Sequence, residues 1–164
     1  SHQPLRQSPQ MWRQHSQNRL RALSADGLRQ VSEDAVLNAN YIKANLQNTY
    51  ELAYDRPCMH EAVFSARAQK AFSVRAMDIA KRLIDYGIHP PTMYFPLIVD
   101  EALMVEPTET ESKETLDAFI AAMEEIAQEI LTSPDIVKNA PHSTPVGRLD
   151  EALAARKPDL RWRP

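Results

Sequence analysis

The stretch LMVEPTETESKETLDAF, residues 103–119, decides the fold because it joins the two kinds of secondary structure that the chain contains. Its first residues form a short apolar run typical of a buried strand. Its last residues begin the clearest helical pattern in the sequence. Between the two lies a cluster of acidic residues and threonines, which is either a functional site or the start of a helix.

Helix initiation is the simpler interpretation of this cluster. Thr108, followed three residues later by Glu111, fits a capping box. Glu109, Glu111 and Glu114 also place negative charge near the positive end of the helix dipole. Glu106 and Thr108 nevertheless remain candidates for lining a pocket, because polar groups often converge where a strand ends before a helix.

Helical periodicity recurs along the chain. Apolar residues at three- and four-residue steps predict a helix over about 26–48 and another over 74–86, which Gly87 and the following prolines end. A third helix of about twenty residues carries the apolar stripe from Leu116 to Leu131. A short helix is predicted over 149–156.

Four short segments are predicted as strands: YELAY (50–54), MHEAVFSA (59–66), MYFPLIV (93–99) and ALMVE (102–106). The first two are joined by DRP, and Pro96 makes the third irregular. Helix, strands, helix, strands and helix with short links predict the α/β fold class in its α+β two-layer form. In this arrangement a small, mainly antiparallel sheet is covered by helices.

The chain of 164 residues is long enough for one domain with a sizeable core. Residues 1–24 are rich in Gln, Arg and Ser and are predicted to form a polar arm, mobile or foreign to the domain. Residues 25–164 then form the domain itself. We find no internal repeat.

Composition excludes several classes of function. Hydrophobic residues make up 43% and charged residues 25%, as in soluble globular proteins. A net charge of -3 gives no field that attracts nucleic acid, and no apolar run is long enough to span a membrane. Cys58 is the single cysteine, so an internal disulfide is excluded and a cytoplasmic location is expected.

Histidines supply two further candidate sites. In IHPPT, residues 88–92, His89 follows a helix stop and precedes two prolines that would preorganise its loop, although the residues alone favour a histidine in a surface turn. In CMHE, residues 58–61, a strand would place Cys58 and His60 on one face and Glu61 on the other. This is poor geometry for a metal, and no metal site is predicted.

Glycine is scarce. The three glycines are isolated, so the chain contains neither GxGxxG nor a P-loop to bind phosphate. A self-contained site for a phosphate-bearing cofactor is therefore not expected.

Longer motifs carry a resemblance that covers roughly residue 25 to the end. They are NANYIKANL (38–46), RPCMHEAVFSA (56–66), DYGIHPPTMYFPLIVDEALMVEPTETESKETLDAF (85–119) and APHSTPVGRLDEALAARKPDLRWRP (140–164). In these motifs the chain resembles the C-terminal part of the glycine cleavage system P-protein, glycine dehydrogenase (decarboxylating), in the form that is split into two subunits. It resembles the second subunit.

The resemblance implies the small C-terminal domain of an aminotransferase-like (fold type I) pyridoxal-phosphate enzyme. In that family glycine loses its carboxylate as carbon dioxide and its aminomethyl group passes to the lipoyl arm of the H-protein, with the cofactor as electron sink. The Schiff-base lysine belongs to the large domain and is not in this chain. The chain alone is therefore expected to be inactive and to bind no pyridoxal phosphate stably.

The resemblance also implies cleft residues and partners. The matching motif positions are His60, Glu61, His89, Thr92, Glu106, Thr108 and Glu109. His89 would orient the carboxylate of glycine or the lipoyl sulfur, and the threonines would donate hydrogen bonds at the rim of the cleft. The partners implied are the large domain, subunit 1 of the P-protein and the lipoyl H-protein.

Two departures and one alternative stand beside this resemblance. Ala62 replaces the phenylalanine of the family's HEF, and residues 1–23 do not resemble the family's apolar linking segment. The alternative is a non-catalytic binding or oligomerisation module that retains the fold. Self-association through the aromatic and methionine residues of 93–104 is expected in that case.

Overall fold

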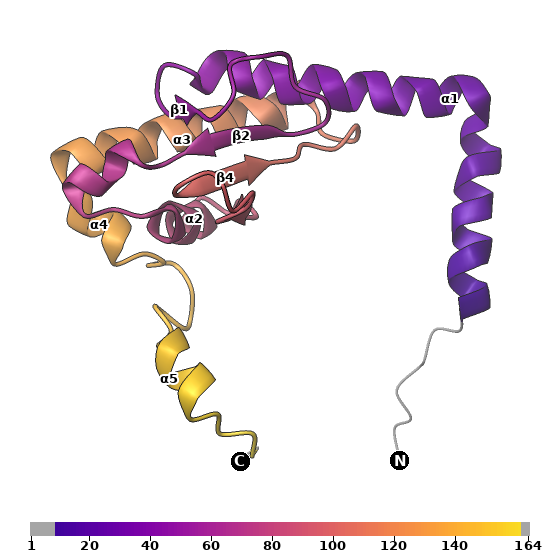
Figure 1. Ribbon diagram of the computed structural model, residues 1–164. Helices are drawn as coiled ribbons and strands as arrows, with labels where there is room; N and C mark the ends of the chain where they lie inside the picture. The colour runs from indigo at the N-terminus through magenta and orange to yellow at the C-terminus, as the bar shows by residue number, and fades with distance from the viewer. Residues whose placement is uncertain (1–8, 162–164) are drawn as a thin grey trace.

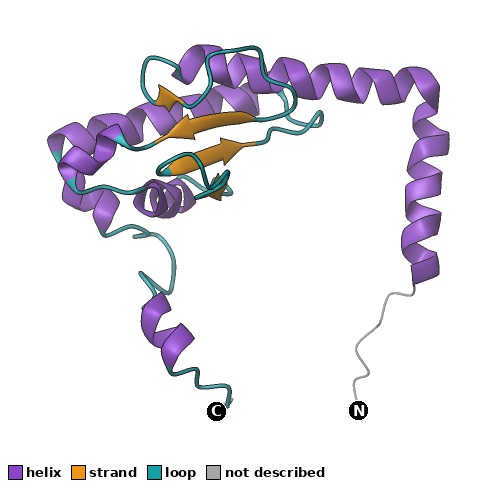
Figure 2. Ribbon diagram, viewed as in Figure 1, coloured by secondary structure: helices purple, strands orange, loops and turns teal. Residues whose placement is uncertain are grey.

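The computed structural model describes residues 9–161, with side chains from residue 23 onward. Its elements follow one another as α1 (Pro9–Leu46), β1 (Glu51–Leu52), β2 (Ala62–Ser65), the 3-10 helix η1 (Ala68–Phe72), α2 (Ala76–Asp85), β3 (Thr92–Met93), β4 (Ala102–Val105), α3 (Lys113–Thr132), α4 (Pro134–Lys138) and α5 (Glu151–Arg156). Helices predominate over short strands (Figure 2).

The strands form one antiparallel sheet in the order β1-β2-β4-β3. Phe64 pairs with Leu103 and Ala62 with Val105, so these side chains share one face of the sheet, and all of them are buried. On the other face Val63 pairs with Met104, and both are only partly buried. The predicted α+β two-layer fold is confirmed.

The core lies between the buried sheet face and the helices. Helix α3 contributes the buried part of the predicted stripe, which is Leu116, Ile120, Met123, Ile126, Ala127 and Ile130. Helices α1 and α3 pack against each other and run side by side along the sheet, while α2 packs against α3 and α4 (Figure 1). Burial of this apolar surface is the main force that holds the short strands together.

Helix α1 ends at Leu46, two residues before the end of the predicted helix 26–48, and it extends back to Pro9. Ser24, with φ of 58° and ψ of -177°, bends the helix at the predicted boundary between arm and domain (Figure 1). Residues 1–8 of the predicted arm lie outside the described residues. A mobile or foreign character of the arm stays a prediction.

The predicted strands were too long. In MYFPLIV only Met93 belongs to a strand, because Tyr94 has a positive φ of 58° and Pro96 has no N–H to donate to a ladder. The residues Met59 to Glu61 precede β2 as a loop, so the expected alternation of His60 and Glu61 across a strand was wrong. The first two predicted strands are present in shortened form as β1 and β2, and they pair with each other in the antiparallel sense.

The capping box at Thr108 was also wrong. Helix α3 begins at Lys113, and its N-cap is Ser112, whose hydroxyl accepts a hydrogen bond from the N–H of Thr115 at 3.2 Å. The carbonyl of Thr108 instead accepts the N–H of Glu111 in a turn that precedes the helix. The start of α3 is therefore four residues later than the sequence pattern indicated, and the segment 106–111 is a loop.

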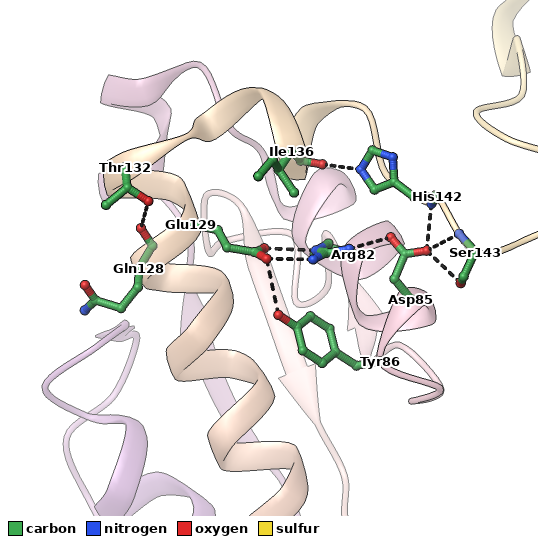
Figure 3. A network of polar contacts seen from close by, with 9 residues as sticks. All are labelled: Arg82, Asp85, Tyr86, Gln128, Glu129, Thr132, Ile136, His142 and Ser143. Carbon is green, nitrogen blue, oxygen red and sulfur yellow. Dashed lines mark hydrogen bonds and ion pairs between the residues drawn. The ribbon is translucent and has the colours of Figure 1, made fainter.

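An ion-pair network joins α2 to α3 (Figure 3). The guanidinium of Arg82 donates to both carboxylate oxygens of Glu129, at 2.9 and 2.6 Å, and to Asp85 at 3.0 Å. The hydroxyl of Tyr86 donates to Glu129 at 3.3 Å. Because the side chains of Arg82, Asp85 and Glu129 are mostly buried, this network is screened less than a surface ion pair.

Asp85 also anchors the segment that follows α4. Its Oδ1 accepts the N–H groups of His142 and Ser143 at 2.6 and 2.7 Å and the Ser143 hydroxyl at 2.8 Å (Figure 3). Burial acts to raise the pKa of Asp85, but the hydrogen bonds from Ser143, Arg82 and His142 outweigh it and lower the pKa to about 2. The ionised carboxylate therefore stabilises the folded chain.

Replacement of Ser112 by Ala tests the start of α3. We expect a loss of about 1 kcal/mol in the free energy of unfolding, because the N–H of Thr115 loses its acceptor. Thr108→Ala serves as the matched control and changes stability by less than about 0.5 kcal/mol. Urea denaturation measures both. A larger loss of unfolding free energy for Thr108→Ala than for Ser112→Ala would show that Thr108, and not Ser112, caps α3.

Replacement of Asp85 by Asn tests the charged anchor. The pKa of Asp85 is lower in the folded chain than its ordinary value, so its stabilisation is complete above about pH 4 and is lost as the pH falls to about 2. We expect Asp85→Asn to lower the free energy of unfolding by about 2 kcal/mol at pH 7, with a smaller difference toward pH 2. Asp135→Asn, at an exposed carboxylate, is the control. A difference independent of pH would contradict this assignment.

Candidate functional site

A groove with a volume of about 570 Å³ opens beside the end of the sheet. One wall is the segment 87–92, which follows α2, and a second is the segment 104–108, which begins in β4. The first turns of α3 and Ile42 of α1 complete the lining. The groove thus gathers four segments that are far apart in the sequence.

The wall after α2 follows from the way in which that helix ends. The N–H of Gly87 bonds to the carbonyl of Ile84, and the N–H of Ile88 bonds to that of Leu83, which is the Schellman arrangement. Gly87 has φ of +72°, a conformation that residues with a side chain rarely adopt. The chain therefore turns directly into the two prolines that hold His89 at the groove.

Four of the seven predicted residues line this groove together. His89 and Thr92 come from the segment after α2, and Glu106 and Thr108 from the segment after β4. The pairing of Thr92 with Met104 across β3 and β4 brings the two segments together. All four residues are exposed, and they stand over a floor of buried apolar side chains that includes Ile42 and Leu116.

The other three predicted residues lie outside the lining. His60 contacts the groove through Glu106, because its Nε2 lies 3.7 Å from the Glu106 carboxylate, and it lies 4.0 Å from that of Glu61. Glu109 follows Thr108 in the same loop but does not line the groove. The MHE motif therefore lies at the edge of the groove, and the EPTE motif lies partly within it.

Cys58 does not have the surroundings of an activated nucleophile. Burial is the largest influence on its thiol and raises the pKa, although Lys43 and Arg56 act in the opposite direction. Among the residues that the structure describes, no three His, Cys, Asp or Glu side chains come together to hold a metal ion. The polar groups that line the groove are hydroxyls, carboxylates and the imidazole of His89, and they stand among apolar side chains such as Met104 and Phe119.

The charge of the groove is negative. Its lining contains the carboxylates of Glu106 and Glu111 together with His89, and the described lining residues include no Lys or Arg. The phosphate of pyridoxal phosphate needs cations or clustered N–H donors, and its aldehyde needs a lysine amine. These lining residues do not fit either requirement, so the groove alone does not bind this cofactor by its two anchoring groups.

Sequence reasoning missed some of the groove. The sequence predicts Glu111 only as part of a helix cap and Met104 only as part of a strand, and it does not single out Thr115, yet all three line the groove. The proximity of a strand end to a helix start and the motif resemblance both pointed to this region in the sequence, but neither singled out these three residues. The actual lining depends on where the loop 106–111 turns, which the pattern placed incorrectly.

The fold and the groove define a class of protein: an α+β two-layer domain with an open groove in which acidic and other polar side chains stand among apolar ones. None of the helices within residues 9–161 combines the length and the apolar character that crossing a membrane requires.

The family model described as glycine dehydrogenase, C-terminal domain, matches residues 31–143. The chain therefore belongs to the glycine dehydrogenase C-terminal domain family, and the resemblance seen in its motifs is confirmed.

Curated relatives agree with this family. The chain is similar to proteins described as probable glycine dehydrogenase (decarboxylating) subunit 2, with 60% identity over 140 residues in Caldanaerobacter subterraneus subsp. tengcongensis and over 143 residues in Shouchella clausii. In Exiguobacterium sibiricum the identity is 59% over 145 residues. These matches cover 85%, 87% and 88% of the chain but only 29%, 29% and 30% of the relatives. The chain thus spans less than a third of their length.

Proposed function

We propose that this chain forms the small C-terminal domain of a pyridoxal-phosphate-dependent glycine dehydrogenase (decarboxylating) of the glycine cleavage system. The enzyme would release carbon dioxide from glycine and pass the aminomethyl group to the lipoyl arm of the H-protein. The observation that carries the proposal is the convergence of His89 and Thr92 with Glu106 and Thr108 in one groove of a chain that belongs to this family.

The groove would form one side of the catalytic cleft. Pyridoxal phosphate, when bound in the complete enzyme, supplies the electron sink for decarboxylation. Because the groove lacks residues that fit the phosphate and the aldehyde, we place the cofactor's anchoring groups in the part of the enzyme that this chain does not span. The chain alone is then inactive.

The chain's own side chains would bind and orient the reactants. The imidazole of His89, on a loop stiffened by two prolines, is placed to donate a hydrogen bond to the carboxylate of glycine or to the lipoyl sulfur. The hydroxyls of Thr92 and Thr108 would donate hydrogen bonds at the rim. His60 and Glu106 face each other at 3.7 Å and would act together at the edge.

The partners follow from the same proposal. Subunit 1, the large domain and the lipoyl H-protein would contact this domain in the cytoplasm.

A second candidate function, a non-catalytic binding or oligomerisation module, is favoured by the exposed apolar loop after β3, where Leu97 and Ile98 are 86% and 83% exposed. Only the first candidate requires the side chain of His89 for decarboxylation.

Replacement of His89 by Ala in the full-length subunit, assembled with subunit 1, tests the catalytic proposal. Loss of an orienting and proton-donating imidazole is expected to reduce kcat for glycine decarboxylation by about 10²- to 10⁴-fold. Gln47→Ala, at an exposed position at the end of α1, is the control and keeps wild-type kinetics. Unchanged kinetics in a folded His89→Ala enzyme would reject the role and favour the binding module.

Reductive labelling tests where the cofactor is held. The 164-residue chain is incubated with pyridoxal phosphate, reduced with borohydride and examined by mass spectrometry. We expect no lysine to be labelled stoichiometrically, because the described groove lining contains no lysine. The full-length subunit, treated in the same way, provides the positive control with one labelled lysine. A single stoichiometric label in the short chain would show that it has its own cofactor site.

A further inference from the structure

The motif Asn38-Ala39-Asn40 in α1 occupies a position that the proposed function leaves unused. Ala39 is 0% exposed and faces the core. Successive residues of an α-helix are separated by about 100°, so the two asparagines lie on opposite flanks of this buried alanine. Both are partly buried, and both side chains reach beyond the helix.

Asn40 holds the loop that carries His60. Its Nδ2 donates to the carbonyl of Cys58 at 2.9 Å, and its Oδ1 accepts the N–H of the same residue at 2.9 Å. One side chain therefore satisfies both backbone groups of a residue that lies outside the sheet ladder. Lys43, one turn further along α1, donates to the carbonyl of Arg56 at 3.0 Å and fixes the same loop at a second point.

Asn38 holds the other loop. Its Nδ2 donates to the carbonyl of Thr108 at 2.9 Å, across 70 residues of sequence. The same carbonyl receives the N–H of Glu111 in the turn before α3. The segment 106–111 is thus tied to α1 at the residue where it lines the groove.

The hydrogen bonds of Asn40 and Asn38 hold the loops that carry His60 and Glu106. His60 lies two residues after Cys58, and Glu106 lies two residues before Thr108. Their side chains approach to 3.7 Å at the edge of the groove. Asparagine is unfavourable in a helix interior. Asn40 also donates to the carbonyl of Val36 within α1 at 2.7 Å, but both asparagines additionally bond to a loop outside the helix, and we attribute their use here to these loop contacts.

We propose that Asn38 and Asn40 are positioning residues, which hold the segments 106–108 and 58–60 at a fixed separation on α1 so that His60 and Glu106 face each other at the groove. The inference rests on the proposed function, because the groove is taken to be one side of a catalytic cleft. It adds two residues that act through others and do not touch the reactants.

Hydrogen–deuterium exchange in the assembled full-length enzyme tests the ties directly. Asn40→Ala is expected to raise the exchange of amides 58–60 about tenfold, since the Cys58 N–H loses its acceptor, and Asn38→Ala is expected to raise exchange in 108–111. Asn45→Ala is the matched control, because Asn45 bonds to Tyr41 in its own helix, and neither loop responds. Unchanged exchange in the Asn38 and Asn40 variants overturns the proposal.

A coupling measurement separates positioning from simple stability. If Asn40 acts through His60, the double variant Asn40→Ala/His60→Ala loses no more kcat/KM for glycine decarboxylation than the more impaired single variant. Asn40→Asp, which keeps the acceptor for Cys58, retains protection of that amide and recovers part of the activity. Additive losses, or normal kinetics in an Asn40→Ala enzyme with a loosened loop, overturn the positioning role.

The proposed function and the positioning role of Asn38 and Asn40 would be refuted by different results. A wild-type assembly that does not decarboxylate glycine refutes the proposed function. It then also refutes a catalytic purpose for the two loops that Asn38 and Asn40 hold. The exchange comparison still decides whether Asn38 and Asn40 hold the two loops. If amide exchange rises in the two loops of the Asn38 and Asn40 variants and stays unchanged in Asn45→Ala, the two asparagines hold the loops whether or not the assembly decarboxylates glycine.

Discussion

The structure depends on the seating of α1 against the core through the ridge of Ala39, Ile42 and Leu46. These side chains are at most 1% exposed and lie three and four residues apart, so they form one stripe on the helix. The short strands, two to four residues long, have too few ladder bonds to be stable without it. The same ridge also places Ile42 in the groove, which couples the core directly to the candidate site.

Periodicity predicted α1, α2 and α3 well because each buries apolar residues on one face, as in α3, where Leu116, Ile120, Met123, Ile126 and Ile130 are buried. Strand lengths and the start of α3 depend on interactions that periodicity does not contain. Thr108 and Ser112 both satisfy local capping rules. The choice between them follows from two hydrogen bonds to the carbonyl of Thr108. One comes from the side chain of Asn38 in α1, and the other comes from the N–H of Glu111 in the turn before α3.

The groove was predictable only in part, because four of the seven predicted residues line it and its geometry left no signal in the sequence. Motif resemblance pointed to His89 and Glu106, but only the pairing of β3 with β4 places their segments on the same groove. His60 was expected on a strand and instead lies on a loop, where its position comes from Asn40. A side chain that binds a loop 18 residues away leaves no periodic signal in the sequence, which is why its role emerges only from the structure.

Electrostatics explains why this groove makes chemical sense as one wall of a larger site. Glycine carries a carboxylate and pyridoxal phosphate a phosphate, and both would be repelled by Glu106 and Glu111 unless cations lay nearby. The described lining provides no Lys or Arg, and the chain spans less than a third of its relatives. An opposing wall that carries the positive charge would bind the anions, while this wall would provide hydrogen bonds and exclude water. Under the proposed function, each wall supplies what the other lacks, so catalysis requires both.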